Sequence, residues 1–385
     1  MIQRSSQRPR RGLLPAGIAI VVVAVVLVAV ANLGGGGSPT TALGPTSATS
    51  NDSGSTGGAG SPEASGSTTT PIPSTSPIFA GGLLVADRGN GRILVLSQQG
   101  AVLWRFPASK AAIPAGQAFS ADDAFIDPNG KTIVANDEFH EVIDRIDIAT
   151  GRIVWQYGRY GTPGAGPGQL HTPDDAYPLA NGDITVADIM NCRVLEIAPD
   201  KSIVRQWGKT GVCHDEAGVT YGLPNGDTPL PDGGLLITEI TGSRVVRLAA
   251  DGHVVFDIHV PVRYPSDAQL DAKGNIIVAD FSTHGQVVAV DPTGKLVWRY
   301  APTSGPGALN HPSLATPLAD GLVVINDDFR DRMIVIDPTT GALVWQYGHA
   351  GRVGTGPGYL NTPDGHQPLP PGIFVSPAPS PSASP

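Results

Sequence analysis

The sequence predicts an all-β fold, a six-bladed β-propeller built from four-stranded blades. A ten-residue segment that closes on a turn glycine occurs six times, starting at residues 121, 173, 224, 265, 312 and 363. Each of the first five copies is followed by an apolar run that ends on an acidic residue, and then by two more apolar runs. Four short strands cannot bury both faces of their own sheet, so such units must pack against neighbours in a ring.

Residues 171–208 contain the clearest copy of the repeat. Asn181-Gly182 is a two-residue turn of the kind that hairpins favour. The runs around it predict four strands, at residues 173–179, 183–187, 193–198 and 202–207. The fourth run carries an aromatic residue in nearly every copy: Trp155, Trp207, Phe256, Trp298 and Trp345. We expect these side chains to pack between blades.

The two ends of the repeat region complement each other. Residues 83–106 repeat the second, third and fourth strands without a clear first strand, whereas the copy at 363 is a first strand alone. This arrangement predicts a closing blade that both ends share. Residues 73–82 fit the first-strand template less well, so closure by the C-terminal segment is the favoured prediction.

The N-terminal segments predict export. Residues 1–12 are basic, and residues 13–33 are apolar without a charge, which is long enough to cross a hydrocarbon core of about 30 Å. Because a basic flank stays in the cytoplasm, we expect a bacterial-type, single-pass cell-membrane protein with the propeller (79–375) outside. The alternative is a secreted protein, since residues 29–31 match a signal-peptide cleavage site.

Two segments flanking the propeller have a different composition. Residues 34–78 consist mainly of Gly, Ser, Thr and Pro, and residues 376–385 form a Pro/Ser tail. Such segments cannot offset their ordering entropy by apolar burial. We therefore expect a disordered stalk and a disordered tail.

Charge and missing motifs exclude several function classes. The net charge is −9, and four arginines of the positive total lie in the first eleven residues, so the rest is strongly acidic. A nucleic-acid partner is excluded because it would require a basic face. The chain also lacks a G-x-S-x-G elbow, a P-loop and a dinucleotide-binding fingerprint.

The chain has two cysteines, Cys192 and Cys213. The first follows a predicted second strand and the second follows the fourth strand of the same blade, so both loops should lie on one face. Outside the cytoplasm this arrangement predicts a disulfide.

One segment resembles the NHL-repeat family of six-bladed propellers. GTPGAGPGQLHTP (161–173) runs into DITVADIMNCRV (183–194), and VADRGNGRI (85–93) repeats the second half of this pattern. The resemblance covers about residues 80–370 and implies the fold. It implies little about function, because the family includes enzymes, sensors and adaptors.

Two other segments resemble the docking motif of quinoprotein dehydrogenases, D-x-x-T-G-x-x-x-W, from PQQ-like repeats. They are DIATGRIVW (147–155) and DPTTGALVW (337–345). Those enzymes form an eight-bladed disc and often carry a vicinal disulfide, whereas this chain has six predicted blades and no adjacent cysteines. We therefore expect no PQQ.

Acidic residues form two sets. The first set ends the second strands and should accept backbone N–H groups of the following loop: Asp87, Asp137, Asp188, Glu239, Asp280 and Asp327. The second set lies at the start of the first strands and should converge on the mouth of the central channel: Asp122, Asp123, Asp174, Asp175, Asp227, Asp267 and Asp364. Carboxylates from several blades suit a hard cation such as calcium. The alternative is a solvated acidic funnel or a set of turn caps.

Histidines accompany the second acidic set. Those expected on the same face are His140, His171, His284, His311 and His366, together with His214 and His349 in loops between blades. Three histidines from different blades can bind zinc, as in the peptidylglycine amidating lyases that this fold resembles. HTPDDAYPLANGDI is also similar to a segment of arylsulfotransferase-like propellers, in which a channel histidine is the nucleophile. No H-x-H or H-E-x-x-H spacing occurs, so ordinary loop histidines are the alternative.

These observations favour a binding module, a sensor or adaptor that recognises an extracytoplasmic protein, a small molecule or a glycan with its loop face. The predicted binding residues are His140, His171, Asp123, Asp175, Asp227, Asp267, His284, His311 and His366. The alternative is a metal-dependent hydrolase, lyase or transferase at the same mouth. Its calcium or zinc ligands would come from Asp123, Asp175, Asp267, His171 and His366.

Overall fold

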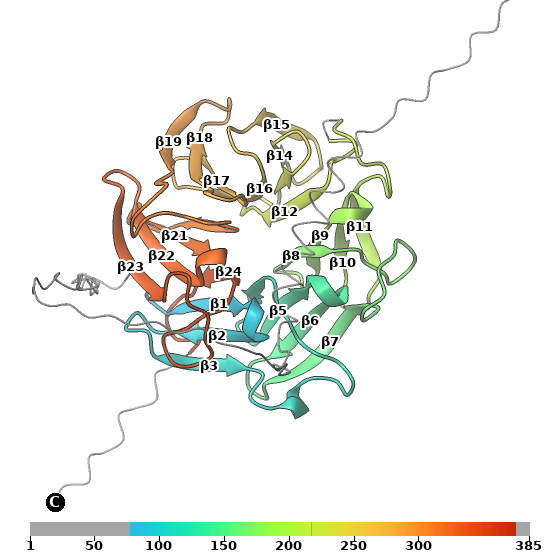
Figure 1. Cartoon of the computed structure of the whole chain (residues 1–385). Coiled ribbons are helices and arrows are strands. Elements are labelled where there is room, and N and C mark those ends of the chain that lie inside the picture. Colours follow the sequence, from blue (N-terminus) through green and yellow to red (C-terminus); the bar gives the residue numbers. More distant parts are fainter. Residues whose placement is uncertain (1–77, 217, 375–385) are drawn as a thin grey trace, which may run out of the picture. The chain divides into compact units, whose positions relative to one another are not determined.

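The computed structural model describes residues 78–216 and 218–374. These residues form six four-stranded antiparallel sheets arranged around a centre (Figure 1). The predicted anchor (13–33), the stalk apart from its last residue, Ile78, and the tail lie outside the described residues. Within those described, no helix is long and apolar enough to cross a membrane.

The six sheets are the predicted blades, each with its first strand innermost. Blade 1 contains β24 (Pro363–Pro368), β1 (Leu83–Asp87), β2 (Arg92–Leu96) and β3 (Val102–Phe106). Blade 2 contains β4 (Ala124–Ile126), β5 (Thr132–Asp137), β6 (Val142–Asp147) and β7 (Arg152–Gly158). Blade 3 contains β8 (Pro173–Pro178), β9 (Ile184–Asp188), β10 (Arg193–Ile197) and β11 (Ile203–Gly208).

The remaining three blades follow the same order. Blade 4 contains β12 (Pro224–Pro229), β13 (Leu235–Glu239), β14 (Arg244–Leu248) and β15 (Val254–His259). Blade 5 contains β16 (Pro265–Leu270), β17 (Ile276–Asp280), β18 (Val287–Val290) and β19 (Leu296–Tyr300). Blade 6 contains β20 (Ala315–Pro317), β21 (Val323–Asp327), β22 (Arg332–Asp337) and β23 (Ala342–Gly348).

Blade 1 closes the ring as predicted. The C-terminal strand β24 pairs antiparallel with β1, with Leu83 opposite Pro368 and Val85 opposite His366. The innermost strand of this blade therefore comes from the C-terminal end of the propeller, and its other three strands come from the N-terminal end.

The hydrophobic core lies between blades, because neighbouring residues of a strand point to opposite faces of its sheet. Leu84 belongs to a cluster with Ile126 and Ile133 of blade 2. The next residue, Val85, belongs to a cluster with Val324 of blade 6. Full burial of each such side chain stabilises the fold by about 1.5–3 kcal/mol, so every blade depends on both neighbours.

The second-strand acids have a structural role, as predicted. Asp137 accepts the backbone N–H of His140 in the following loop, as expected, and all six acids also accept N–H groups of the loop before the first strand. Asp188 accepts the backbone N–H of His171 at 2.7 Å and the Nε of Arg193 at 2.7 Å. Asp327 accepts from Asn310 N and Arg332 Nε in the same way. These carboxylates therefore bind the loop that precedes the first strand of their own blade.

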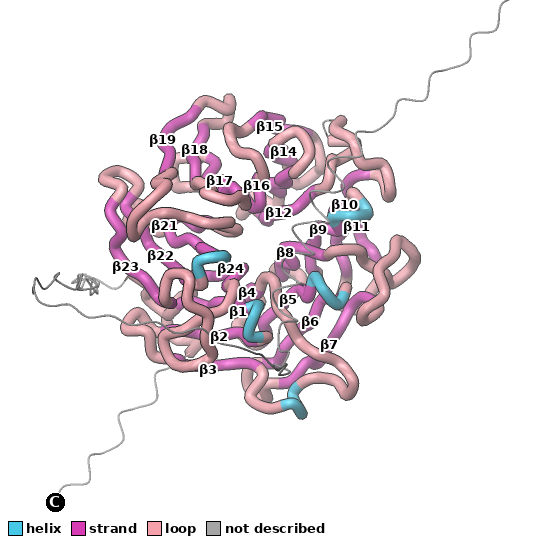
Figure 2. The backbone as a smooth tube through the Cα atoms, viewed as in Figure 1, coloured by secondary structure: helices cyan, strands magenta, loops and turns pink. Residues whose placement is uncertain are grey.

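Short 3-10 helical turns connect the second and third strands in four blades (cyan in Figure 2). They are η1 (Arg88–Asn90), η3 (Glu138–His140), η4 (Ile189–Asn191) and η5 (Asp328–Arg330), while η2 (Lys110–Ala112) lies in the connection from blade 1 to blade 2. Each of the four is followed by a residue with positive φ: Gly91, Glu141, Cys192 and Asp331. Because of the up-and-down topology, these turns share one face with the starts of the first strands.

The predicted disulfide is confirmed. Cys192 and Cys213 are bonded, with a Cα–Cα distance of 5.2 Å. The bond joins the turn after η4 to the loop that leaves β11, and it therefore cross-links the mouth-side loops of blade 3.

The five predicted outer-strand aromatics pack against clusters that include residues of the next blade, as predicted, although Trp207 does so from a different strand position. Trp104, Trp155 and Trp345 donate their indole N–H groups to carbonyls of the next blade. In blade 3 the equivalent position is Arg205, which faces Glu196 just before the register shift, whereas Trp207 faces Val194. The repeat was misaligned there because an aromatic residue also occurs two positions later in the strand.

Candidate functional site

The channel mouth is the end of the channel where the first strands begin. Four first strands start with a bulge, for example between Asp174 and Tyr177 of β8 and between Pro265 and Ala268 of β16. A bulge inserts an extra residue and redirects the side chains around it. Asp175 has φ 49° within this irregular stretch, so two successive carboxylates of blade 3 reach the centre of the ring.

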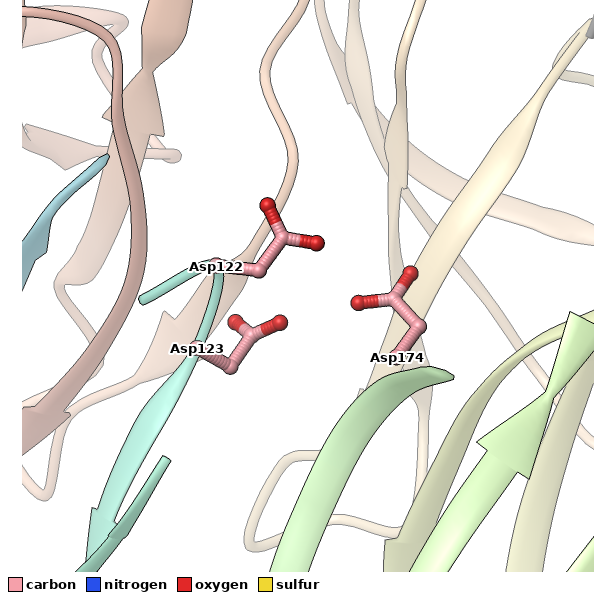
Figure 3. Close-up of side chains that lie close together, drawn as sticks. All are labelled: Asp122, Asp123 and Asp174. Atoms are coloured by element: carbon pink, nitrogen blue, oxygen red, sulfur yellow. The ribbon is translucent and has the colours of Figure 1, made fainter. Parts of the chain in front are cut away.

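Three carboxyl groups meet at the mouth between blades 2 and 3. Asp122 and Asp123 precede β4, and Asp174 lies at the start of β8. In Figure 3 the three side chains point toward one another. Each offers an oxygen within 4.8 Å of the other two. Among the described residues this is the only such group of three, and it contains oxygen ligands alone.

One cation lies beside these carboxylates. Arg88 of η1 contacts Asp122, donates to Asp364 Oδ2 at 2.6 Å and donates to Glu138 Oε2 at 2.6 Å. Its guanidinium also stacks over the ring of Phe139, 4.3 Å from the centroid. Among the described ion pairs, Arg88 is the only cation that contacts the mouth carboxylates, so negative charge remains in excess.

Burial and crowding disfavour ionisation of these groups. Burial, together with the negative charge of Asp364, raises the pKa of Asp123 to about 7. Burial also raises the pKa of Asp122 and Asp174 well above the usual range, and neighbouring carboxylates add to the shift. A bound cation would relieve both effects, since opposite charge favours the ionised form.

A second tier of carboxylates lies next along the channel. Asp267 accepts hydrogen bonds from Thr228 Oγ1 at 2.8 Å and Gln269 Nε2 at 2.9 Å. Asp175 is 3% exposed, and its Oδ2 has no hydrogen-bond partner among the described residues. A Cβ at Gly226 would lie 3.0 Å from Asp175 Oδ2 and from Asp267 Oδ1, so the glycine leaves the space that both oxygens face. Asp227 is fully buried, and burial raises its pKa well above the usual range.

The predicted histidines do not join the acidic groups. His140 pairs with Asp137 and stacks on Tyr160; the hydrogen bond to Asp137 raises its pKa. His171 is half-buried and His284 is exposed. His214 and His349 lie in loops between blades, where His349 stacks on Tyr359.

The remaining two predicted histidines are neutral. Burial lowers the pKa of His311 to about 4, and the ring packs 4.2 Å from Phe329. Burial lowers the pKa of His366 to about 3. His366 Nδ1 is hydrogen-bonded to Asn326 Oδ1 in the neighbouring blade. Neither belongs to the group of ligand atoms at the mouth.

Several mouth residues were missed from the sequence. Arg88, Glu138 and the half-buried aromatics Phe139, Tyr264, Phe281 and Phe329 come from turns after second strands or from loops before first strands. Tyr264 donates to Asn225 at 2.9 Å, and Phe281 packs on Phe329 at 5.9 Å. A signal was available, because three of the aromatics follow a second-strand acid within two residues: Phe139, Phe281 and Phe329.

The family follows from a match along most of the chain. A model of PQQ-like repeats described as outer membrane protein assembly factor BamB matches residues 46–205 and 204–356. The chain belongs to this family. The match includes 147–155 and 337–345, the segments that carry the second resemblance noted above. In this BamB-type propeller, Trp155 and Trp345 of those segments bind carbonyls of neighbouring blades.

Similarities to solved structures bear on the fold alone. A protein of unknown function from Bacteroides caccae aligns with a TM-score of 0.52 and 17% identity over 76% of this chain and 98% of its own. A chain of the nidogen/laminin complex aligns with a TM-score of 0.50 and 16% identity over 74% and 97%. Virginiamycin B lyase from Staphylococcus aureus aligns with a TM-score of 0.43 and 16% identity over 59% and 69%. No curated protein matches the sequence.

Proposed function

We propose that this propeller is an extracytoplasmic binding module that holds a calcium-type cation at its channel mouth and recognises a ligand around it. The ligand would be a protein, a small molecule or a glycan, and the N-terminal segment would tether the propeller to the cell membrane or direct its secretion. The observation that carries the proposal is the mouth group of Asp122, Asp123 and Asp174, whose oxygens lie within 4.8 Å of one another.

The ligand set favours a hard cation. Calcium takes six to eight oxygen ligands, and it accepts carboxylates in flexible geometry. The three carboxylates supply protein oxygens, and the unpartnered Asp175 Oδ2 adds another buried acceptor in the next tier. Zinc is the weaker candidate, because it prefers nitrogen and sulfur ligands and no histidine belongs to the described group.

The rim supplies contact area for a ligand. Phe139, Tyr264, Phe281 and Phe329 are half-buried around the acidic mouth, and aromatic side chains contribute large contact areas at interfaces. A ligand bearing its own carboxylate or hydroxyl groups could therefore coordinate the cation while its apolar part packs on the rim.

The test is the metal content of the full-length protein, together with its melting temperature before and after chelation. We expect near-stoichiometric calcium and a lower melting temperature in chelator. Asp174→Asn should abolish both. If the chelator removes no metal and leaves the melting temperature unchanged, the proposal is wrong.

An enzymatic role is the second candidate, and the raised pKa of Asp123 favours it. A carboxyl group with a pKa of about 7 can exchange a proton near neutral pH. A bound cation would lower this pKa, and the resulting carboxylate could serve a metal-dependent hydrolase, lyase or transferase as general base. The test is turnover of ester, lactone or glycan substrates. Turnover that is lost in Asp123→Asn, together with calcium binding that is kept in Asp123→Glu, would support this role over binding alone.

A further inference from the structure

One position of the outer strands ties blades together on the face opposite the mouth. Trp104 Nε1 donates to Ile148 O at 3.2 Å, Trp155 Nε1 to Pro199 O at 2.8 Å, and Trp345 Nε1 to Gln98 O at 3.1 Å. Arg205 takes this position in blade 3 and donates to Ala250 O at 3.0 Å. In all four cases the acceptor lies in the turn between the third and fourth strands of the next blade.

Blades 4 and 5 depart from this rule. Blade 4 carries Phe256 at the position, which has no N–H to donate. Trp298 of β19 stands at the same position, opposite Ala289 and before the register shift. Among the described residues, its indole N–H has no acceptor, although Pro338 stands where the other blades provide one. A cavity of about 740 Å³ lies there instead, lined by Trp298, Pro338, the turn at 271–273 and the segment 317–323. The cleft lies between blades 5 and 6, which are neighbours in Figure 1.

The chain itself shows what fills an equivalent cleft. Between blades 6 and 1, Phe79 packs edge-on against Trp345, with ring centroids 5.1 Å apart. The residue before it, Ile78, donates its backbone N–H to Gln98 Oε1 at 2.9 Å. Phe79 is 4% exposed and belongs to the same cluster as Trp345. A short segment with an Ile-Phe pair therefore covers this tryptophan.

A second Ile-Phe pair fills the cleft between blades 1 and 2. Phe374 packs on Trp104 with ring centroids 5.8 Å apart. Ile373 and Phe374 both pack against the cluster that includes Trp104 and Ile148. The two termini of the propeller thus use the same dipeptide for the same kind of cleft. At Trp155, Lys201 lies over the ring instead, 5.9 Å from its centroid.

We propose that the Trp298 cleft docks a short segment of a partner protein that carries an aliphatic-aromatic pair of the Ile-Phe type. The aromatic ring would pack on Trp298, and a backbone carbonyl of the segment would accept the indole N–H. The rim carries Asp271, Asp320 and Asp337 against Lys273, so basic residues flanking the pair complement its charge. This site lies at the opposite end of the blades from the mouth and is independent of the cation.

The test uses a labelled peptide, Lys-Ser-Pro-Ile-Phe-Ala-Gly-Lys, which places residues 76–81 of this chain between two lysines. Fluorescence anisotropy with the full-length protein should show saturable binding. The same peptide with Ala in place of Phe should bind at least tenfold more weakly. Absence of saturable binding at millimolar protein, or equal binding of the two peptides, would overturn the proposal.

Three protein variants locate the site. Ala272→Arg fills the cleft from an exposed turn and should weaken binding at least tenfold, whereas Ala180→Arg, at the equivalent exposed position of blade 3, should not. Trp298→Phe should weaken binding several-fold through loss of the N–H, and the fold should tolerate it because Phe256 holds that position in blade 4. Equal affinities of Ala272→Arg and Ala180→Arg would place the peptide elsewhere and contradict the assignment.

Discussion

The protonation state of Asp123 affects both the stability of the channel mouth near neutral pH and its capacity to bind a cation. The group is 4% exposed, and burial raises its pKa to about 7. A carboxylate in this position destabilises the protein near neutral pH unless a cation compensates it. Binding of the proposed cation would therefore relieve an unfavourable charge at the mouth.

Asp123→Asn should stabilise the metal-free protein, because it removes a carboxylate that burial disfavours. The expected gain at pH 7 is on the order of a few kcal/mol, from the size of the pKa shift. The same variant should lose calcium binding. Thermal unfolding in chelator and in calcium measures both effects, and the exposed turn residue Asp200, changed to Asn, is the control. A destabilised metal-free variant would show that the carboxylate is stabilising after all.

Stability of the metal-free protein should fall as pH rises. In the folded state the pKa of Asp123, Glu141 and Asp144 is raised to about 7. These groups lose a proton near pH 4 when unfolded but keep it until about pH 7 when folded. The free energy of unfolding therefore decreases as pH rises across this window. Melting temperatures measured from pH 4 to pH 8 in chelator should decrease. Calcium should reduce the decrease, because it would favour ionised Asp123. A pH profile that calcium leaves unchanged would show that calcium does not bind at the mouth.

The single blade is held by its loops as well as by its ladder. In blade 3, Asp188 is fully buried and joins the loop before β8 to Arg193 at the start of β10. The disulfide from Cys192 then secures the loop that leaves β11. The mouth-side loops of this blade are therefore fixed by a disulfide, an ion pair and a hydrogen bond.

Breaking the buried ion pair between Asp188 and Arg193 should lower the free energy of unfolding. Asp188→Asn keeps an acceptor for the His171 N–H but leaves Arg193 without its counter-charge, at an expected cost of about 3–5 kcal/mol. Asp232→Asn breaks the exposed pair with Arg247 and should cost about 0–1 kcal/mol. Chemical denaturation measures both, and similar losses for the two variants would contradict the assigned role of burial.

Loss of the disulfide should also destabilise the protein. The bond closes a separation of 21 residues, for which chain-entropy arguments give about 3 kcal/mol. Replacement of Cys192 and Cys213 by Ser together should lower the unfolding free energy by this amount without changing calcium affinity. An unchanged denaturation midpoint would show that Asp188 and the ladder alone fix these loops.

At the scale of the whole ring, closure by β24 links the two ends of the propeller. Each blade buries both faces against neighbours, as Leu84 and Val85 do on opposite sides of β1. Without β24, blade 1 has no innermost strand and the mouth lacks Asp364, the partner of Arg88.

A chain that ends at residue 362 should therefore not fold cooperatively. A chain that ends at residue 374, which keeps β24 and the Phe374 contact with Trp104, should melt like the full-length protein. Circular dichroism and limited proteolysis distinguish the two. A cooperative transition in the shorter chain would show that five blades and the rest of blade 1 suffice.

The ring was predictable because its repeats encode it locally. The turn glycines and the second-strand acids identified the blades, and the lone first strand at 363 identified the closing blade. The disulfide was predicted from the positions of Cys192 and Cys213 after two strands of one blade. The mouth was predictable only in part, because the bulges at Asp174 and Pro265 decide which carboxylates converge. Arg88 and Glu138 lie in turns whose direction no periodicity encodes. The repeat position of Trp207 was misassigned because aromatic residues two positions apart satisfy the same pattern.

The most direct test of the cation site is isothermal titration of metal-free protein with calcium in two buffers of different ionisation enthalpy. We expect one calcium per chain and release of protons at pH 7, because raised pKa values keep carboxyls protonated there. The signal should be lost in Asp123→Asn and Asp174→Asn. Absence of binding, or binding that both variants retain, would contradict a cation site at the channel mouth.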